Sequence, residues 1–567
     1  MSPNPTTTTP KPPLDVLILG TGFAGTYLLH RLLNLNYNVL AIDASSQLGG
    51  VWNHNTYPGS RVDIEVPYYQ LSLPELFSTP KDEKAPSDDG FGGFRWKERF
   101  PGREELQAYF RFVEQRLGKK GEGEGRGLSK YCVFQTWVES AVWEEREKVW
   151  VVRARDGREW RARWFLPCVG YASKPYVPDF PGLESFEGSK THTANWSQVG
   201  GALEVEGKRV GVVGTGASGV QVIQTIAPIV GSLTVFQQTP ALVIPMRQKP
   251  FDTSFQKKSP EERNTFFNDR LSRWDGASGT LIMRTAKSDT PEQREAEFSR
   301  LWEQGGFSFW TSNYMDAWGD VESNDLIYGY WARQIRKRIN DPEKRDLLAP
   351  LKAPYAFGTK RVPLEQTYYE SYNLPHVDLV NLREDPIAEV IPEGLKLKSG
   401  ATYDLDVLIL ATGFDFSVGS MTQLDIRGTN GLPLSEKWSN GTKTQIGMAV
   451  EGFPNMLFPY GPQSPSNTCC GPVCAEVQGE WIVKLLESVR EKGQKRVEAE
   501  KAAEEEWSAH ATRLLKGTLF EGTKSYYFAD NVPGRKREPL FYFGGLPGYK
   551  GKLEEVQGSG YGGFNFQ

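Results

Sequence analysis

The chain has 567 residues, of which 39% are hydrophobic and 24% are charged, and its formal net charge is −4. This length predicts two or three domains, and the composition excludes a largely disordered chain. The weak net charge gives no electrostatic reason to expect a nucleic-acid partner. No hydrophobic run reaches the roughly 18 residues that cross a bilayer. We therefore expect no membrane insertion and a cytoplasmic protein.

The five cysteines are too few for the disulfide framework of a small secreted domain. The segment CCGPVC at 469–474 has no second Cys-x-x-Cys pair, and only five histidines are scattered through the chain, so we predict no metal site. Residues 1–12, MSPNPTTTTPKP, lack the apolar segment of a secretory signal and are expected to form a disordered tail.

A strand–helix–strand unit is predicted near the N-terminus. The apolar strand LDVLIL runs into a G-x-G-x-x-G motif, a helical pattern follows, and the strand NVLAID ends at Asp43. The glycines of the motif are Gly20, Gly22 and Gly25. Glycines at this spacing permit a tight turn and close approach to a pyrophosphate, and a carboxylate at this distance binds ribose hydroxyls.

A second copy of the unit begins at KRVGVVGTGASGV. Its glycines are Gly214, Gly216 and Gly219. Its second strand ends in Gln238 and Thr239, where the first copy has Asp43. Because a carboxylate there would repel a ribose 2′-phosphate, its absence favours NADP at this site and FAD at the first. Two dinucleotide sites on one chain predict electron transfer between two cofactors.

A third apolar strand is predicted at 406–410, before Ala411-Thr412-Gly413. We expect it to pair with the strand that ends in CVG at 168–170, so that these segments mark where the chain leaves and re-enters the first domain. The predicted fold is α/β, with two Rossmann-like domains and the NADP domain inserted into a discontinuous FAD domain. The expected boundaries are 13–178 and 381–567 for the FAD domain, 179–200 for a linker and 201–380 for the NADP domain.

The segment from about 245 to 345 is charged and rich in aromatic residues, and it predicts a helical insertion in the NADP domain. Thr290, Pro291 and Gln293 have the spacing of a helix start with a capping threonine. The tryptophans of this segment have two interpretations, packing in a core or lining a substrate cavity.

In combination, these motifs resemble the flavin-containing Baeyer–Villiger monooxygenases, a class B flavoprotein family. GGVWNHNTYPGSRVD at 49–63 is similar to the family element G-G-x-W-x-x-N-x-Y-P-G-x-x-x-D, and FEGSKTHTANWS at 186–197 is similar to its F-x-G-x-x-x-H-x-x-x-W fingerprint. The resemblance extends through GTKRVPLEQTYYESYNLPHVDLVNL and LILATGFD and covers residues from about 13 to 550.

The resemblance implies that NADPH reduces FAD and that O2 then forms a C4a-peroxyflavin, which converts a ketone to an ester or lactone. It implies that Arg361 and Asp63 are catalytic, with Arg361 stabilising negative charge on oxygen and Asp63 orienting it. The alternative activity is a related flavin monooxygenase acting on nitrogen or sulfur. A non-catalytic FAD-fold binding module is the third interpretation.

The motifs and the resemblance together imply three groups of site residues. The FAD site comprises Gly20, Gly22, Phe23, Ala24, Gly25, Asp43, Gly50, Val51, Trp52, Asp63, Tyr69 and Val138. The NADP site comprises Gly214, Thr215, Gly216, Ser218, Gly219, Gln221, Gln238, Thr239, Lys360 and Tyr526. The fingerprint residues are Phe186, Gly188, His192 and Trp196. These are implied to form a hinge-like linker between the domains, whereas simple packing is the alternative for an isolated His-x-x-x-Trp.

Three positions depart from the family pattern. Gln238 stands where the family often has an arginine on the 2′-phosphate, which leaves Lys360 and Thr239 for that contact. Tyr526 stands where a tryptophan is usual, and Ser197 ends the fingerprint where proline or aspartate is usual. We therefore expect altered contacts on the nicotinamide side and a preference for NADPH that depends more on Lys360.

Overall fold

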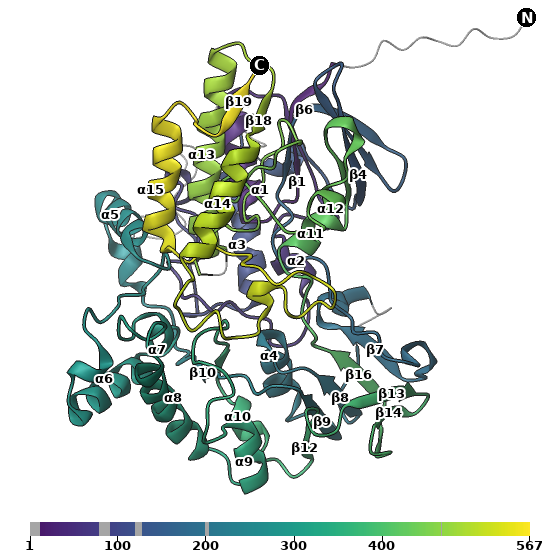
Figure 1. Cartoon of the computed structure of the whole chain (residues 1–567), viewed down its shortest axis with the longest axis vertical. Coiled ribbons are helices and arrows are strands. Elements are labelled where there is room, and N and C mark those ends of the chain that lie inside the picture. Colours follow the sequence, from purple (N-terminus) through teal and green to yellow (C-terminus); the bar gives the residue numbers. More distant parts are fainter. Residues whose placement is uncertain (1–11, 79–90, 120–126, 199–202, 467) are drawn as a thin grey trace, which may run out of the picture.

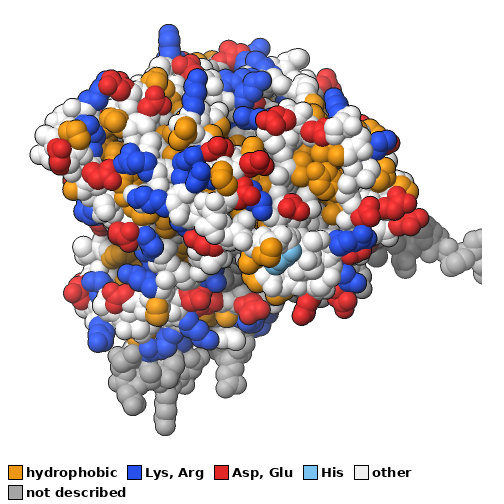
Figure 2. Space-filling view, turned by 90° about the horizontal axis from the view of Figure 1, so that it is seen from below, with side chains coloured by type: hydrophobic (Ala, Val, Ile, Leu, Met, Phe, Trp, Pro, Cys, Tyr) orange, Lys and Arg blue, Asp and Glu red, His pale blue; other side chains and the backbone are white. Residues whose placement is uncertain are grey.

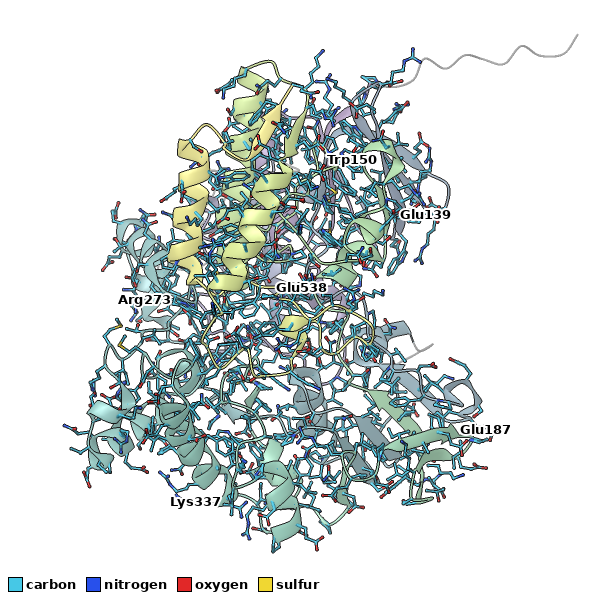
Figure 3. The ribbon with its side chains drawn as sticks, viewed as in Figure 1. Glu139, Trp150, Glu187, Arg273, Lys337 and Glu538 are labelled. Carbon is cyan, nitrogen blue, oxygen red and sulfur yellow. The ribbon has the colours of Figure 1, made fainter. Side chains whose placement is uncertain are left out.

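The computed structural model describes residues 12–78, 91–119, 127–198, 203–466 and 468–567, so almost all of the expected tail at 1–12 lies outside the described residues. The described chain forms two lobes, one above the other in Figure 1. The upper lobe contains a seven-stranded sheet and the long helices near the C-terminus, and the lower lobe contains a five-stranded sheet and a group of helices beside it. Figure 3 places Trp150 in the upper lobe and Glu187 and Lys337 in the lower lobe.

The upper sheet has the strand order β17-β4-β5-β6-β1-β2-β3. Its strands are β1 (Leu14–Leu19), β2 (Val39–Ile42), β3 (Cys132–Val133), β4 (Val138–Glu144), β5 (Val149–Ala154), β6 (Glu159–Pro167) and β17 (Asp425–Arg427). Strands β6, β1, β2 and β3 run parallel to one another. Strand β5 runs antiparallel to both of its neighbours, β4 and β6. The apolar run in β1 is buried because this strand has a neighbour on each side and helices over the sheet.

Helices surround the sheet of the upper lobe, with α1 packed on β1 and β2 and α13 packed on α1. They are α1 (Phe23–Asn34), α2 (Val51–His54), α3 (Arg103–Arg116), α11 (Val418–Thr422), α12 (Leu434–Lys437), α13 (Gly471–Glu491), α14 (Lys501–Arg513) and α15 (Gly545–Gly558). A Cβ at Gly479 of α13 would lie 2.6 Å from the ring of Tyr27 in α1. Glycine at this position therefore allows the two helices to approach. A two-stranded antiparallel sheet of β18 (Val497–Ala499) and β19 (Phe564–Phe566) joins the C-terminus to this lobe.

The lower sheet is entirely parallel, with the order β12-β9-β8-β16-β7. Its strands are β7 (Ser189–His192), β8 (Arg209–Val213), β9 (Ser232–Gln237), β12 (Val377–Asn381) and β16 (Val407–Leu410). Helix α4 (Ala217–Ile226) follows the second glycine motif, and α10 (Tyr368–Ser371) packs on it. An antiparallel meander of β13 (Ile387–Ile391), β14 (Gly394–Leu397) and β15 (Thr402–Asp404) separates β12 from β16 along the chain.

The position of β16 differs from the expectation in two ways. It lies between β8 and β7 in the lower sheet and does not pair with β6. The expected end of the NADP domain at residue 380 would also leave β16 outside the sheet to which it belongs. Both β6 and β16 instead end beside a glycine turn of their own sheet. A Cβ at Gly20 would lie 2.5 Å from the Cys168 carbonyl, and one at Gly214 would lie 2.6 Å from the Ala411 carbonyl. Apolar patterning marks both strands as buried but does not distinguish the sheets to which they belong.

The fingerprint segment also differs from a simple linker. Residues 189–192 form the edge strand β7, whose His192 is in register with Leu410 of β16. Trp196 is buried in the core of the lower lobe, and a Cβ at Gly188 would lie 2.6 Å from the Asp406 carbonyl. The part of the fingerprint that the structure describes is therefore integrated into the lower lobe. Residues 199–200 of the expected linker lie outside the described residues.

The segment at 245–345 is helical, as its sequence predicts. Its helices are α5 (Pro260–Asp269), α6 (Pro291–Gln304), α7 (Ser308–Thr311) and α8 (Val321–Arg336), with α9 (Pro342–Leu348) crossing its end. Thr290 and Gln293 form the predicted reciprocal capping box at the start of α6. Trp331 is fully buried and donates to the Val243 carbonyl at 2.8 Å, so this tryptophan packs in the core.

The surface is mixed in charge. Figure 2 shows basic and acidic side chains interspersed over the underside of the molecule, in agreement with the formal net charge of −4. Within the described ranges, no helix has both the length and the apolar character needed to span a membrane. The five cysteines are free thiols, and four of them are buried.

Alanine substitution of Gly25, compared with that of a glycine in an open position, tests the close packing of the first glycine turn. A Cβ at Gly25 would lie 1.9 Å from the Gly20 carbonyl oxygen, whereas nothing lies within 4 Å of a Cβ at Gly551 in α15. We expect Gly25→Ala to lower stability by about 1–3 kcal/mol through overpacking. The matched variant Gly551→Ala should raise stability by up to about 1 kcal/mol, because alanine is the better helix former. Thermal unfolding of the two variants beside the parent protein measures both effects; equal melting temperatures would contradict the close contact.

Candidate active site

The first glycine turn forms a cradle that only glycine can line. Gly20 has φ +101°, and its carbonyl lies against Gly25 at the start of α1. The loop that precedes α2 lies against this turn, since a Cβ at Gly50 would be 2.8 Å from the Cα of Gly22. Backbone N–H groups at a helix start bind phosphate, so this cradle fits the pyrophosphate of a dinucleotide.

Asp43 lies at the end of β2, beside the first turn. Its carboxylate accepts hydrogen bonds from the backbone N–H and hydroxyl of Thr21, at 2.6 and 2.7 Å, and from the N–H of Ser45 at 2.8 Å. Burial alone would raise the pKa of Asp43, but hydrogen bonds from His54, Ser45 and Thr21 lower it to about 2. The predicted ribose-binding carboxylate is therefore ionised at neutral pH.

Three aromatic residues of the predicted FAD site meet beside this turn. The indole N–H of Trp52 donates to the Tyr69 hydroxyl at 3.2 Å, and Phe23 packs edge-on against Tyr69 with ring centroids 5.3 Å apart. Val51 begins α2 and is 45% exposed, whereas Val138 begins β4 and is buried. Ala24 is buried in α1.

The two predicted catalytic residues form a bidentate ion pair. The Nε of Arg361 lies 2.7 Å from one carboxylate oxygen of Asp63, and its Nη2 lies 2.8 Å from the other. Burial would lower the pKa of the guanidinium, but Asp63 raises it well above its usual range. Arg361 is contributed by the segment between α9 and β11 (Leu364–Glu365), and Asp63 by the loop after α2, so the pair joins the two lobes.

Aromatic side chains surround Arg361. The guanidinium lies over the ring of Phe307, 5.0 Å from its centroid, and interacts electrostatically with Tyr171 and Tyr527. Burial raises the pKa of Tyr526 to about 12 even though Arg361 lowers it, so this hydroxyl keeps its proton at neutral pH. Sequence reasoning identified Tyr526 but missed the other three, because one sequence does not reveal which of 23 tyrosines and 30 phenylalanines meet at one point.

Two predicted NADP contacts, Ser218 and Gln221 on α4, bond across to the upper lobe. The Tyr57 hydroxyl donates to the Gln221 side chain at 2.9 Å and lies 3.5 Å from the Ser218 hydroxyl. Gln221 in turn donates to the carbonyl of Arg61 at 2.9 Å. A Cβ at Gly59, which has φ +78°, would lie 2.7 Å from the Gln221 carbonyl. These contacts hold the loop that carries Asp63 against α4.

The second glycine turn repeats the geometry of the first. Gly214 has φ +105°, and a Cβ at Gly219 would lie 2.4 Å from its carbonyl oxygen. Nothing lies within 4 Å of a Cβ at Gly216, so the middle of this turn is open. Thr215 donates to the Thr239 carbonyl at 3.0 Å and ties the turn to the end of β9. This cradle also fits a dinucleotide pyrophosphate.

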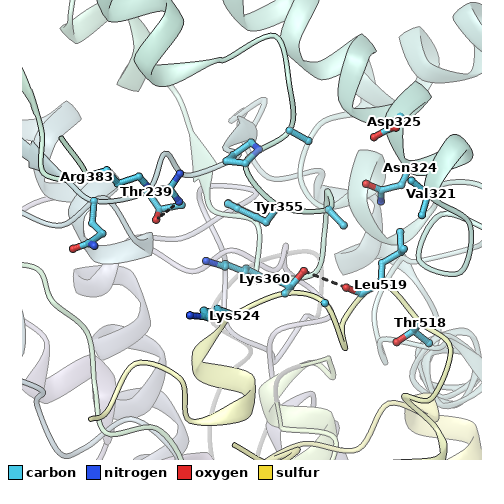
Figure 4. Close-up of a pocket in the computed structure, with 16 residues that line it drawn as sticks. Thr239, Val321, Asn324, Asp325, Tyr355, Lys360, Arg383, Thr518, Leu519 and Lys524 are labelled. Atoms are coloured by element: carbon cyan, nitrogen blue, oxygen red, sulfur yellow. Dashed lines mark hydrogen bonds between the residues drawn. The ribbon is translucent and has the colours of Figure 1, made fainter.

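A cavity of about 750 Å³ opens beside the end of β9. Its lining includes three residues of the predicted NADP site, Gln238, Thr239 and Lys360. It also includes two further cations, Arg383 and Lys524 (Figure 4). Sequence reasoning missed the last two residues. The available signal for Arg383 was a cation two residues beyond an apolar strand.

Lys360 is held within this cavity by Tyr355. Its Nζ lies 4.4 Å from the centre of the Tyr355 ring, and the Tyr355 hydroxyl accepts from the Leu242 N–H at 3.2 Å. Burial and the neighbouring charge of Arg383 lower the pKa of Lys360 to about 8. The next residue, Arg361, points instead to Asp63, so consecutive side chains of this segment serve two different places.

His192 lies at the end of β7. Its Nδ1 accepts from the Ala194 N–H at 3.1 Å, and its ring packs edge-on against Phe414 at 5.8 Å. Burial lowers the pKa of His192 to about 4, so the ring is neutral at pH 7. Phe186 belongs to a separate core cluster beneath the β13–β15 meander. The predicted coupling role of the fingerprint stays a prediction.

Comparison with known proteins identifies the family. Residues 18–78 match the NAD(P)-binding Rossmann-like domain. The chain is 38% identical to cyclopentanone 1,2-monooxygenase of Comamonas sp. over 97% of this chain and 96% of that protein. The chain belongs to the flavin-containing Baeyer–Villiger monooxygenases.

A solved structure and a second relative are also similar to this chain. A crystal structure of OTEMO in complex with FAD and NADP superposes with a TM-score of 0.88 at 31% identity, covering 98% of this chain and 100% of that one. The phenazine N-monooxygenase PhzNO1 of Lysobacter antibioticus is 35% identical over 97% of this chain and 96% of its own length. The protein described here uses FAD and NADP, and its two glycine cradles fit these dinucleotides.

The charge of Asp43 gives a pH-dependent prediction. Because the folded pKa of about 2 lies below the ordinary aspartate value, Asp43 stabilises the folded state above about pH 4, and this contribution is lost as the pH falls toward 2. We expect Asp43→Asn to cost on the order of 2 kcal/mol at pH 7. The difference in melting temperature from the parent protein should be constant between pH 7 and pH 5. A difference that already shrinks in that interval would contradict the low pKa.

Lys360 gives a second prediction in the NADP cavity. We expect Lys360→Ala to raise the Michaelis constant for NADPH about tenfold and to leave that for NADH nearly unchanged, because only NADPH carries the 2′-phosphate. Steady-state oxidation of both coenzymes measures the effect. The control Lys352→Ala removes a lysine from the exposed start of the same connection. Equal changes for NADPH and NADH would exclude this role.

Proposed function

We propose that this monooxygenase converts a ketone to an ester or lactone, with Arg361 as the catalytic cation and Asp63 as the residue that orients it. One atom of O2 enters the bond beside the carbonyl, and the other leaves as water at the expense of NADPH. The observation that carries the proposal is the bidentate pair between Arg361 and Asp63 at the junction of the two lobes.

FAD, when bound and reduced by NADPH, supplies the activated oxygen. The protein's own residues supply fixed charge and shape. Negative charge develops on oxygen both at activation and at attack on a carbonyl, and a preorganised guanidinium stabilises such charge most strongly in a water-poor site. Arg361 meets this requirement because its pKa is raised, so it stays protonated throughout.

Asp63 serves as a positioning residue in this proposal. By binding Nε and Nη2, it fixes the plane of the guanidinium. The ring of Phe307 lies against the guanidinium and limits its movement. The surrounding aromatic residues exclude water and favour an apolar carbonyl compound as the substrate class.

Oxygenation of nitrogen is the second candidate, favoured by one observation. The phenazine N-monooxygenase of Lysobacter antibioticus shares 35% identity along 97% of this chain. Cyclic and aryl ketones, tested beside a heteroaromatic amine such as a phenazine, separate the candidates by mass spectrometry. Gain of one oxygen on the ketones supports the proposal, and gain on the amine alone supports N-oxygenation.

Replacement of Arg361 should separate reduction from oxygenation. We expect Arg361→Ala to reduce its flavin with NADPH under anaerobic conditions, because hydride transfer leaves no isolated charge on oxygen. In air it should lose ester formation by about 100- to 1000-fold and release hydrogen peroxide instead. Anaerobic stopped-flow reduction and aerobic product analysis of the same preparation measure the two steps.

Two further variants control this experiment. Arg158→Ala breaks an arginine–aspartate pair on an exposed turn and should leave both steps unchanged. Arg361→Lys keeps the charge but loses the planar fork, so it should also reduce its flavin and should restore little ester formation. Normal ester yield from Arg361→Ala that retains its flavin would remove Arg361 from the mechanism.

A further inference from the structure

Strand pairing in the lower sheet determines the position of Arg383. Strands β9 and β12 run parallel with Gln237 opposite Asn381, and the Leu382 N–H donates to the Gln237 carbonyl at 2.9 Å. The chains that leave these two strands therefore emerge side by side at the carboxyl edge of the sheet, where ligands bind in open α/β sheets. Arg383 and Thr239 occupy equivalent positions, two residues beyond the paired ends.

The side chains complete this juxtaposition. Arg383 donates from Nη2 to the Thr239 hydroxyl at 3.0 Å, and both residues line the cavity that contains Lys360 (Figure 4). Gln238, the first residue after β9, also lines the cavity but carries no charge. A cation from the neighbouring strand thus lies next to the position at which the sequence lacks one.

The cavity has an excess of positive charge. Lys360, Arg383 and Lys524 line it against one carboxylate, that of Asp325, and none of the three cations forms an ion pair within the ranges that the structure describes. Arg383 also contributes to lowering the pKa of Lys360, after the effect of burial. Like charges placed together repel unless an anion separates them, so the site is suited to a doubly charged phosphate.

We propose that Arg383 binds the 2′-phosphate of NADP in this protein and takes the place of the arginine that is missing at position 238. The proposal rests on the use of NADP at the lower sheet. The planar guanidinium matches two phosphate oxygens at once, whereas Lys360 offers a point charge. Thr239, which already accepts a hydrogen bond from Arg383, orients the guanidinium toward the cavity.

Binding of NADP⁺ and NAD⁺ to the flavin-loaded protein tests the proposal without turnover. In isothermal titration, Arg383→Ala should weaken NADP⁺ binding about tenfold or more and change NAD⁺ binding less than about twofold. The fragment 2′,5′-ADP should lose affinity in the same proportion, because it carries the same phosphate. Lys337→Ala is the matched control: it removes one exposed positive charge from the end of α8, away from the cavity, and should leave all three affinities unchanged (Figure 3).

A relocated arginine provides the sharper test. In the Arg383→Ala background, Gln238→Arg should recover most of the lost NADP⁺ affinity, since both positions open into one cavity. Unchanged NADP⁺ binding in Arg383→Ala, or an equal loss for NAD⁺, would overturn the role of Arg383 and leave NADP use intact. If the parent protein itself bound NADP⁺ and NAD⁺ equally well, the use of NADP would fail first, and this proposal with it.

Discussion

The ion pair between Arg361 and Asp63, whose side chains are 20% and 26% exposed, is the constraint on which the arrangement of the two lobes depends. Removing two charges from water costs several kcal/mol for each ion, and their attraction offsets this only when the geometry is good. The pair meets that condition with two contacts of 2.7 and 2.8 Å. Because both side chains keep some exposure, solvent screens the pair, which adds little net stability, and loss of one partner costs less than it would in a fully buried pair. Its value lies in holding a guanidinium at a fixed place in an aromatic, water-poor setting.

The lobes must therefore approach in one register, and small residues allow it. Gly59 has φ +78° and lies against α4, where a side chain would strike the Gln221 carbonyl. Tyr57, two residues earlier, donates to the Gln221 side chain, and Gln221 donates back to the Arg61 carbonyl. The Y-P-G element thus serves as a contact between the lobes as well as a carrier of Asp63. Because α4 begins at the second glycine turn, the geometry of one predicted dinucleotide site is linked mechanically to the proposed catalytic pair.

Sequence reasoning succeeded where the determining interactions are local. The glycine turns and the capping box of α6 depend on residues within a few positions of each other, and the structure has both. It failed where the position of a segment depends on which strands pair with one another. Apolar patterning marks β16 as buried, but only the tertiary structure places it between β8 and β7, so the lower sheet extends to Leu410. Arg383 was missed for the same reason, since 144 residues separate it from Thr239.

The neighbouring positions of Lys360 and Arg361 connect the cavity of the predicted NADP site with the ion pair at the junction of the lobes. The segment is anchored before them: Gly358 lies against Trp310 and Trp318, with its carbonyl accepting from the Trp310 indole at 3.0 Å. Thr359 shares a hydrogen bond of 2.9 Å with Thr523, in the C-terminal segment that also carries Lys524 to the cavity. An anion drawn to Lys360 therefore acts on the same short backbone that holds Arg361. Any shift of this backbone would disturb the bidentate contact with Asp63, because that geometry tolerates little displacement. The position of Lys360 in the cavity and the position of the Arg361 charge at the lobe junction thus both depend on one anchored segment.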